Sequence, residues 1–312
     1  MLGPPIPLGR VNLRLDPPDL GALLSPEIVK TSVESVRTAI AAALDSRIGG
    51  PEARERWTEV LEAPGERLLA PDSPVLVVHA DIAMLVGGLR ALLLQSLHPR
   101  AMAGVAQHSN YREDPWGRLQ RTADFLGVVT FGPKEWAVRS VEAVKRVHSR
   151  VQGMTSAGEP YSANDPHLLR WVHLAEVDSF LAAHRRYGSK KLSSADEDRY
   201  VADMSITAEL LGVQGAPRSV SELRAQLHAY DPELRSTREA RDAARYLALP
   251  AGLSAPERLG YAPILAGAIA LLPLRARFML RLPFLPVTER LVVQPAVSTA
   301  LGLGRWSRPD RR

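Results

Sequence analysis

The segment DPWGRLQRTADFL, residues 114 to 126, carries three side chains whose spacing lets them act together. Its opening aspartate and proline are typical of a helix N-cap and first turn, so we expect a helix to about Leu126. In such a helix Arg118, Arg121 and Thr122 fall within an arc of about 100 degrees. Two guanidinium groups on one partly buried face indicate an anion or a carboxylate as partner.

An internal partner for these arginines is the alternative interpretation. Guanidinium stays charged at any ordinary pH and needs acceptors when it is removed from water. Salt bridges to Asp124, Glu135 or Glu142 would supply such acceptors within the chain. Helical periodicity is compatible with both interpretations.

A histidine on an apolar helix face is the next candidate. We expect a helix from Pro133 to Gln152, stopped by Gly153, and its inward stripe consists of Val141, Val144, His148 and Val151. A buried neutral imidazole needs a partner, because burying an unpaired polar group costs free energy. A metal ion and a main-chain carbonyl both meet that need, so His148 is either a metal ligand or a core histidine.

Three further histidines are candidates for the same site. His173, in LLRWVHLAEVDSF, shares a helix face with apolar side chains and is a possible second ligand or supporting residue. His98 directly precedes a proline and is expected at a helix end, because that position disfavours helical torsions. His108 follows in GVAQHSNY. His98 and His108 are equally well interpreted as loop residues that bond the backbone.

Other reaction centres lack their residues in this sequence. The absence of cysteine excludes disulfides, thiolate-ligated haem, iron–sulfur clusters and cysteine nucleophiles. The chain has no HExxH, no paired Glu-x-x-His helices and no close His/His/carboxylate set, so a zinc hydrolase or di-iron bundle lacks its ligands. The sequence has no GxSxG turn and no glycine-rich phosphate loop, so it gives little support to the hypothesis of a hydrolase or a nucleotide-dependent enzyme.

The elements that must position these side chains are nearly all helical. A serine cap at Ser25 and a second Asp-Pro pair at Asp165 each open a helix, and the latter ends at Gly188. Residues 74–99 are apolar nearly all round, as in a helix at the centre of a bundle. Segments with β-alternation are scarce. The sequence predicts one all-α globular domain of about ten helices.

Composition and charge set the domain organisation. A hydrophobic content of 46% over 312 residues allows a sizeable core. We expect a proline-rich arm over residues 1–25, the main domain over 26–295 and a basic tail over 296–312. The formal charge of +5 is too diffuse along the chain to favour nucleic acid as a partner.

The location in the cell is inferred from the missing signals. No basic region followed by an apolar run of about 7–15 residues opens the chain, so a cytoplasmic protein is expected. The apolar run from Tyr261 to Leu274 is shorter than the roughly 18 residues that span a membrane, and no transmembrane helix is expected. A buried helix ending near Pro273 is expected there, with an interfacial helix in peripheral membrane contact as the alternative.

Several runs of the sequence carry a family resemblance in the same order. They are LLLQSLHPRAMAGVAQHSNYREDPWGRLQRTADFLGVVTFG, VKRVHSRVQG, YSANDPHLLRWVHLAEVDSF and YGSKKLSSADEDRYVADMSITAELLG. Over about residues 75 to 290 the chain resembles the catalytic domain shared by the latex clearing proteins (rubber oxygenases) and the mpaB-type oxygenases. The resemblance implies an all-α, globin-like core that holds one haem b.

The resemblance also assigns roles to particular residues. His148 matches the proximal iron ligand, and Arg118 and Thr122 match the arginine and threonine of the distal signature. Arg121 departs from the rubber-cleaving members, which have a lysine that can occupy the distal iron position. Arginine has no lone pair to give iron, so the sixth position is expected to be open or filled by water or a histidine.

The implied function is a haem-b-dependent oxygenase that uses O2 to oxidise or cleave an unsaturated apolar small molecule. Arg118, Arg121 and Thr122 would orient oxygen and substrate, and the arginines could also pair with the haem propionates. Rubber is not expected as the substrate, because no secretion signal is visible. A non-catalytic haem- or lipid-binding protein or sensor is one alternative. A haem peroxidase is another, and it would need a distal acid–base residue such as His98 or His108.

Overall fold

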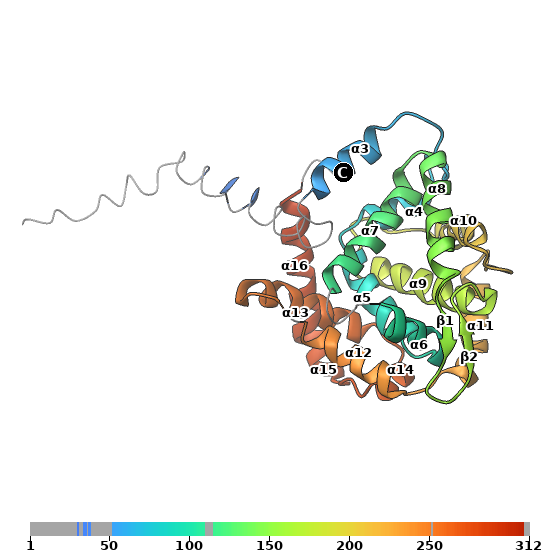
Figure 1. The fold of residues 1–312 in the computed structure, drawn as a ribbon. Coiled ribbons are helices and arrows are strands. Elements are labelled where there is room, and N and C mark those ends of the chain that lie inside the picture. Colours follow the sequence, from blue (N-terminus) through green and yellow to red (C-terminus); the bar gives the residue numbers. More distant parts are fainter. Residues whose placement is uncertain are drawn as a thin grey trace, which may run out of the picture.

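The computed structural model describes residues 52–109, 115–250 and 252–308, together with residues 30, 34, 35, 37 and 38. The predicted arm over residues 1–25 lies outside the described residues, and so does most of the helix predicted from Ser25. In the described part the chain forms one helical domain with one short β-hairpin (Figure 1). The prediction of an all-α domain is confirmed.

The elements follow one another with short connections. The helices are α3 (Ala53–Glu62), α4 (Pro74–Ala80), α5 (Met84–Gln95), α6 (Pro99–His108), α7 (Pro115–Phe131), α8 (Lys134–His148), α9 (Pro166–Tyr187), α10 (Ser194–Leu211), α11 (Val220–Ala229), the 3-10 turn η1 (Asp231–Glu233), α12 (Arg238–Ala248), α13 (Ala255–Ala270), α14 (Leu274–Leu280), α15 (Pro286–Thr288), the π-helical turn η2 (Glu289–Val293) and α16 (Gln294–Trp306). The strands β1 (Gln152–Met154) and β2 (Pro160–Ser162) pair antiparallel. The described residues thus hold more helical segments than the ten expected.

The centre of the domain is the contact between α5 and α9, and the other helices surround this pair (Figure 1). Gly87 lets the two helices approach closely, because a Cβ atom at this position would lie 2.7 Å from Cδ1 of Phe180. The main core cluster joins α9 to α4, α5 and α10, with Trp171 and Tyr200 among its fully buried side chains. A helix pair packed this tightly gives the domain a rigid frame.

Residues 74–99 form two buried helices and the start of α6, which corrects the single helix predicted from their composition. Helices α4 and α5 meet at an angle of 93°. Asp81 lies at the break in an extended conformation, with φ −80° and ψ 135°. Its carboxylate accepts hydrogen bonds from the main-chain N–H groups of Ala83 and Ser189, each at 2.8 Å. These bonds hold the extended backbone that ends α4.

Helices α7 and α8 form a hairpin, and their bounds differ from those predicted. Helix α7 continues to Phe131, beyond the expected end at Leu126, and Gly132 with Pro133 makes the connection. Helix α8 ends at His148, earlier than the predicted Gln152. The residues that follow leave the helix to form strand β1, where their main chain pairs with β2. Gly153 therefore lies in a strand and does not stop a helix.

The start of α9 is confirmed at the predicted Asp-Pro pair. The Asp165 carboxylate accepts a hydrogen bond from the N–H of His167 at 2.9 Å, as an N-cap does. The helix ends at the predicted Gly188. Helix α10 opens with a capping box in which Ser193 and Asp196 bond each other's backbone N–H groups. The capping signal at Asp165 thus predicted the start of α9 correctly.

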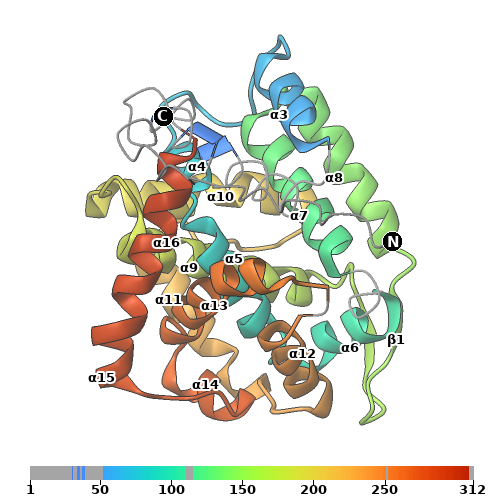
Figure 2. The ribbon, with the colours of Figure 1, turned by 90° about the vertical axis from the view of Figure 1, so that its left-hand side faces the viewer.

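The carboxyl-terminal helices pack on one another and against α5 and α9 (Figure 2). Helix α13 ends at Ala270, close to the predicted end near Pro273. Helix α16 buries Val297 and Leu301 in a second core cluster, so residues 296–306, which were expected in a basic tail, form a helix packed on the domain. An Arg305–Asp81 ion pair of 2.7 Å also anchors this helix.

None of the described helices is by itself both long enough and apolar enough to cross a bilayer. The bent pairs α4 with α5 and α13 with α14 meet the length and composition criteria only when joined across their breaks of 93° and 120°.

Candidate functional site

The α7–α8 hairpin brings the first group of predicted site residues to one end of the domain. With a rise of 1.5 Å per residue, Arg118 lies about 20 Å from the end of α7 at Phe131, and His148 lies about 21 Å from the start of α8 at Lys134. The two helices pack against each other. Their far ends both lie by the end of α6, where Arg118 contacts Ser109 and the chain that follows His148 contacts His108.

Arg118 and Thr122 have described partners on their own side of the hairpin. The Arg118 guanidinium donates to the Ser109 hydroxyl at 3.4 Å, which links α7 to the end of α6. Thr122 donates its hydroxyl to the main-chain carbonyl of Arg118 at 3.0 Å. Arg118 is half-buried, whereas Arg121 and Thr122 are exposed. The Arg121 and Thr122 side chains are therefore in contact with solvent.

Two of the carboxylates proposed as internal partners bind other cations. Asp124 contacts the guanidinium of Arg56 on α3 at 3.4 Å. Glu142 contacts Lys145, one turn along α8, at 3.4 Å. Both carboxylates therefore already have a partner of their own.

His148 occupies the last position of α8 and is half-buried. Its Nδ1 atom is shielded from solvent and has no hydrogen-bond partner among the described residues. Burial lowers the pKa of this imidazole below its ordinary value. The ring is therefore held neutral, which is the protonation state that a metal ligand requires.

His108 lies at the same end of the domain and is held by the hairpin that follows α8. Its Nε2 atom is 3.2 Å from the main-chain carbonyl of Gln152 and 3.1 Å from the Tyr161 hydroxyl. Tyr161 in turn donates to the Gln107 side chain at 2.7 Å. The interpretation of His108 as a residue that bonds the backbone agrees with this geometry.

His98 lies at the opposite end of α6, about 15 Å from His108 by the helical rise. It caps α6 in an extended conformation, as expected for a residue before proline. Its Nε2 atom lies 3.3 Å from Oε2 of Glu233 and does not bond the backbone. His98 is thereby separated from the residues around His148.

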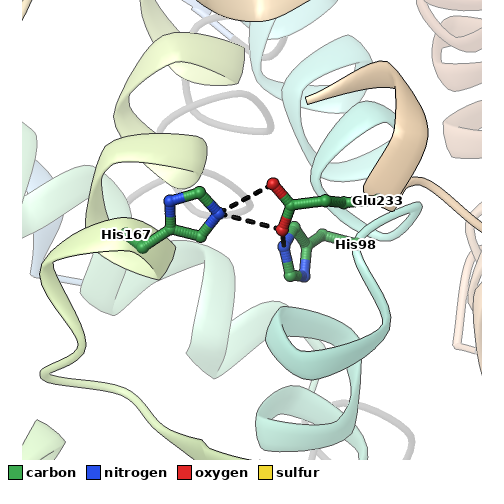
Figure 3. A group of neighbouring side chains, drawn as sticks. All are labelled: His98, His167 and Glu233. Atoms are coloured by element: carbon green, nitrogen blue, oxygen red, sulfur yellow. Dashed lines mark hydrogen bonds and ion pairs between the residues drawn. The ribbon is translucent and has the colours of Figure 1, made fainter. Parts of the chain in front are cut away.

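A His/His/carboxylate set does exist among the described residues, which corrects the statement that none occurs. His98, His167 and Glu233 place one ligand atom each within 4.8 Å of one another (Figure 3). Burial would raise the pKa of the Glu233 carboxyl, but the hydrogen bonds and charges of His167 and His98 hold it below its usual value. Proximity of such distant positions is not visible in the sequence. One signal was available, since His167 and Glu233 each follow directly after an Asp-Pro pair.

His173 is buried on α9, on the same face as Val177 and Phe180, as predicted. Burial lowers its pKa to about 4, and its Nε2 atom has no partner among the described residues. One turn further along α9, burial raises the pKa of Glu176 to about 7. The sequence analysis did not identify Glu176 as a titratable group with a shifted pKa. The only sequence feature that could have indicated it is its position three residues after His173 on the same helix.

Comparison with known proteins gives the family. Residues 76–307 match the family described as "ER-bound oxygenase mpaB/B'/Rubber oxygenase, catalytic domain". The chain belongs to the mpaB and rubber oxygenase family. The match includes the entire α7–α8 hairpin and α9, and membership of this family makes the chain an oxygenase and thus an oxidoreductase.

A solved structure supports the fold of this mpaB and rubber oxygenase family member. The structure of latex clearing protein LCP in the closed state aligns with 88% of this chain and 83% of that chain, with a TM-score of 0.54 and 18% sequence identity. At this identity the alignment shows a shared helical fold. No curated protein matched the chain significantly. The resemblance inferred from the sequence is therefore confirmed at the level of family and fold.

Proposed function

We propose that this chain is a haem-b-dependent oxygenase that acts with O2 on an unsaturated apolar small molecule, and that it works in the cytoplasm. Family membership supports the oxygenase class. The observation that carries the haem assignment is the solvent-shielded Nδ1 atom of His148, which has no hydrogen-bond partner among the described residues and lies on the same helical hairpin as Arg118 and Thr122.

Two side chains at this end of the domain have the donor chemistry that a haem requires. His148 offers a neutral imidazole, because burial lowers its pKa. Arg118 offers a charged fork that suits a carboxylate such as a haem propionate. Four other histidines also have unpartnered buried ring nitrogens among the described residues, namely His79, His98, His173 and His184. His148 is preferred because it is the one that shares the hairpin with Arg118 and Thr122.

When bound, haem supplies the redox chemistry that activates O2, and the protein supplies binding and orientation. Arg118 and Arg121 remain positively charged and orient an anionic group or a polarised oxygen atom. Thr122 directs its hydroxyl proton to its own helix, so its oxygen can accept a hydrogen bond from a ligand.

Arg121 also distinguishes this protein from the rubber-cleaving members. A lysine at that position can lose its proton when buried and then donate a lone pair, whereas arginine stays protonated. We therefore expect that no side chain from position 121 closes the sixth position of the haem. His98 cannot serve there either, because it lies at the far end of α6 and contacts Glu233.

The decisive experiment is haem reconstitution of the full-length protein. Wild-type protein should acquire a Soret band and one haem per chain by pyridine haemochrome analysis, and His148→Ala should lose both. His228→Ala is the matched control, because that side chain is 86% exposed on α11 and should not affect loading. If His173→Ala lost haem while His148→Ala bound haem fully, the iron ligand would be His173 and not His148.

Turnover separates the oxygenase from the alternatives. Consumption of O2 with a reductant and an unsaturated apolar substrate, abolished in His148→Ala, supports the proposal. A haem-loaded protein that consumes no O2 with any such substrate would be a carrier or sensor. Oxidation of small phenols by peroxide alone would indicate a peroxidase, in which His108 is the remaining candidate for a distal acid–base group.

A further inference from the structure

Three segments that are distant in sequence meet at His98, His167 and Glu233 (Figure 3). His98 caps α6, His167 lies in the first turn of α9, and Glu233 ends the turn η1. Nε2 of His167 lies 2.9 Å from both carboxylate oxygens of Glu233, and Nε2 of His98 lies 3.3 Å from one of them. The ligand atoms of all three side chains thus point toward one position.

Tyr230 orients the His167 ring. Its hydroxyl donates to the main-chain carbonyl of His167 at 2.8 Å and also lies 3.2 Å from Nδ1 of the same residue. Arg170 donates to the same hydroxyl at 3.3 Å. With the hydroxyl proton on the carbonyl, the hydroxyl can accept from Nδ1–H, and this tautomer of a neutral His167 carries its lone pair on Nε2.

In that tautomer the Nε2 lone pair faces the Glu233 carboxylate at 2.9 Å, and a metal cation between the nitrogen and the oxygens would satisfy both. His98 points its own Nε2 to the same carboxylate from a side chain that is 3% exposed. A single metal ion at this position would therefore bind all three side chains.

We propose that His98, His167 and Glu233 bind a divalent transition-metal ion, with Zn²⁺ as the best match. Zinc bonds nitrogen and carboxylate oxygen at about 2.0–2.2 Å, so neighbouring ligands of a tetrahedral ion lie about 3.3 Å apart. The observed separations of 2.9 and 3.3 Å are close to that edge. Two nitrogen donors out of three disfavour Ca²⁺ and Mg²⁺, which select oxygen ligands.

The surroundings hold the site rigid and leave one side open. The His98 ring contacts the rings of Trp171 and Tyr230 at centroid distances of 6.1 and 6.2 Å. His167 and Glu233 are each 39% exposed, so water can complete the coordination. The ion would join the starts of α6 and α9 to η1, and this role does not depend on haem binding at His148.

The test is a metal titration of the full-length protein after treatment with a chelator. Wild-type protein should retain one equivalent of Zn²⁺ after gel filtration and should show a tetrahedral visible spectrum with Co²⁺. His167→Ala and Glu233→Gln should each weaken Zn²⁺ binding by at least about tenfold, because each removes a direct ligand. Fe²⁺ titrated under anaerobic conditions distinguishes an iron site, in which Fe²⁺ would be retained in preference to Zn²⁺.

Two further variants sharpen the result. Tyr230→Phe keeps the ring but removes the group that orients His167, and it should weaken Zn²⁺ binding by about 10–100-fold. His228→Ala removes a solvent-exposed histidine that contacts Asp231 at 2.8 Å and none of the three proposed ligands, and this variant should bind Zn²⁺ as wild type does. Haem loading measured on the same samples should be equal in all variants.

The proposal is overturned if wild-type protein retains no divalent ion, or if His167→Ala and Glu233→Gln retain as much as wild type. If the protein retained Fe²⁺ in preference to Zn²⁺, the three residues would still be a metal site, but the assignment of Zn²⁺ would be wrong. Unfolding curves recorded without metal establish that each variant is folded before titration. Failure of haem binding in His148→Ala, with zinc binding intact, would leave this inference untouched.

Discussion

The hydroxyl of Thr122 donates a hydrogen bond to the main-chain carbonyl of Arg118, 3.0 Å away and one turn earlier in α7. This bond uses the only proton of the hydroxyl, so a ligand can meet only its lone pairs. Arg118 itself reaches Ser109 at the end of α6. The two residues therefore form one polar surface, in which Arg118 brings the charge and Thr122 the acceptor.

Replacement of this acceptor gives the first prediction. Thr122→Val keeps the shape but removes the oxygen, and we expect haem content to stay at the wild-type level while the rate of O2 consumption falls about tenfold, the equivalent of one hydrogen bond. Thr122→Ser should restore most of the rate. Equal rates for Thr122→Val and wild type would show that the hydroxyl has no part in turnover.

The second prediction concerns Glu176 and pH. Burial raises its folded-state pKa to about 7, above the unfolded value, so its carboxyl favours the folded state when protonated and opposes it when ionised. As the pH rises from about 4.5 to 7, this group removes on the order of 3 kcal/mol of stability. Glu176→Gln should therefore be more stable than wild type at pH 8, with the difference vanishing near pH 4.

Urea unfolding at both pH values measures this difference. Glu59→Gln, at an exposed position of α3, is the control and should change the free energy of unfolding by less than about 0.5 kcal/mol at either pH. A Glu176→Gln variant less stable than wild type at pH 8 would mean that the carboxylate is stabilised by a charge partner.

The third prediction tests the contact between α5 and α9. A Cβ atom at Gly87 would lie 2.7 Å from the Phe180 side chain and 3.0 Å from its Cα, so Gly87→Ala must force the central helices apart. We expect a loss of about 1–3 kcal/mol in thermal or urea unfolding. At neighbouring Gly88 nothing lies within 4 Å, and Gly88→Ala should gain up to about 1 kcal/mol from helix propensity. Equal effects at both positions would contradict the packing argument.

The fourth prediction tests whether α16 belongs to the domain. Leu301 is 1% exposed in the second core cluster, so Leu301→Ala should cost about 2–5 kcal/mol of unfolding free energy. Leu303, on the same helix but 49% exposed, should tolerate alanine with a change below about 0.5 kcal/mol. If the residues from 296 onward were a dispensable tail, both substitutions would be silent in differential scanning calorimetry.

Local signals made the secondary structure predictable where caps and breakers are strong. The Asp-Pro pair at Asp165 and the glycine at Gly188 bound α9 as expected, because both act within a few residues of the helix ends. The end of α8 at His148 was not predictable, since it depends on the pairing of β1 with β2. The break at Asp81 depends on Ser189, which is 108 residues away.

The sequence by itself determined the all-α class and the helices that carry Arg118, Thr122 and His148, because periodicity and capping are properties of neighbouring residues. The family followed from the resemblance of its motifs. Only the tertiary structure brought His98, His167 and Glu233 to one point and moved His98 away from His108. Their proximity arises from the packing of α6, α9 and η1, whose contacts join residues up to 135 positions apart. No local sequence pattern indicates that these three residues lie close together, because the contacts that bring them together are distributed over the whole core.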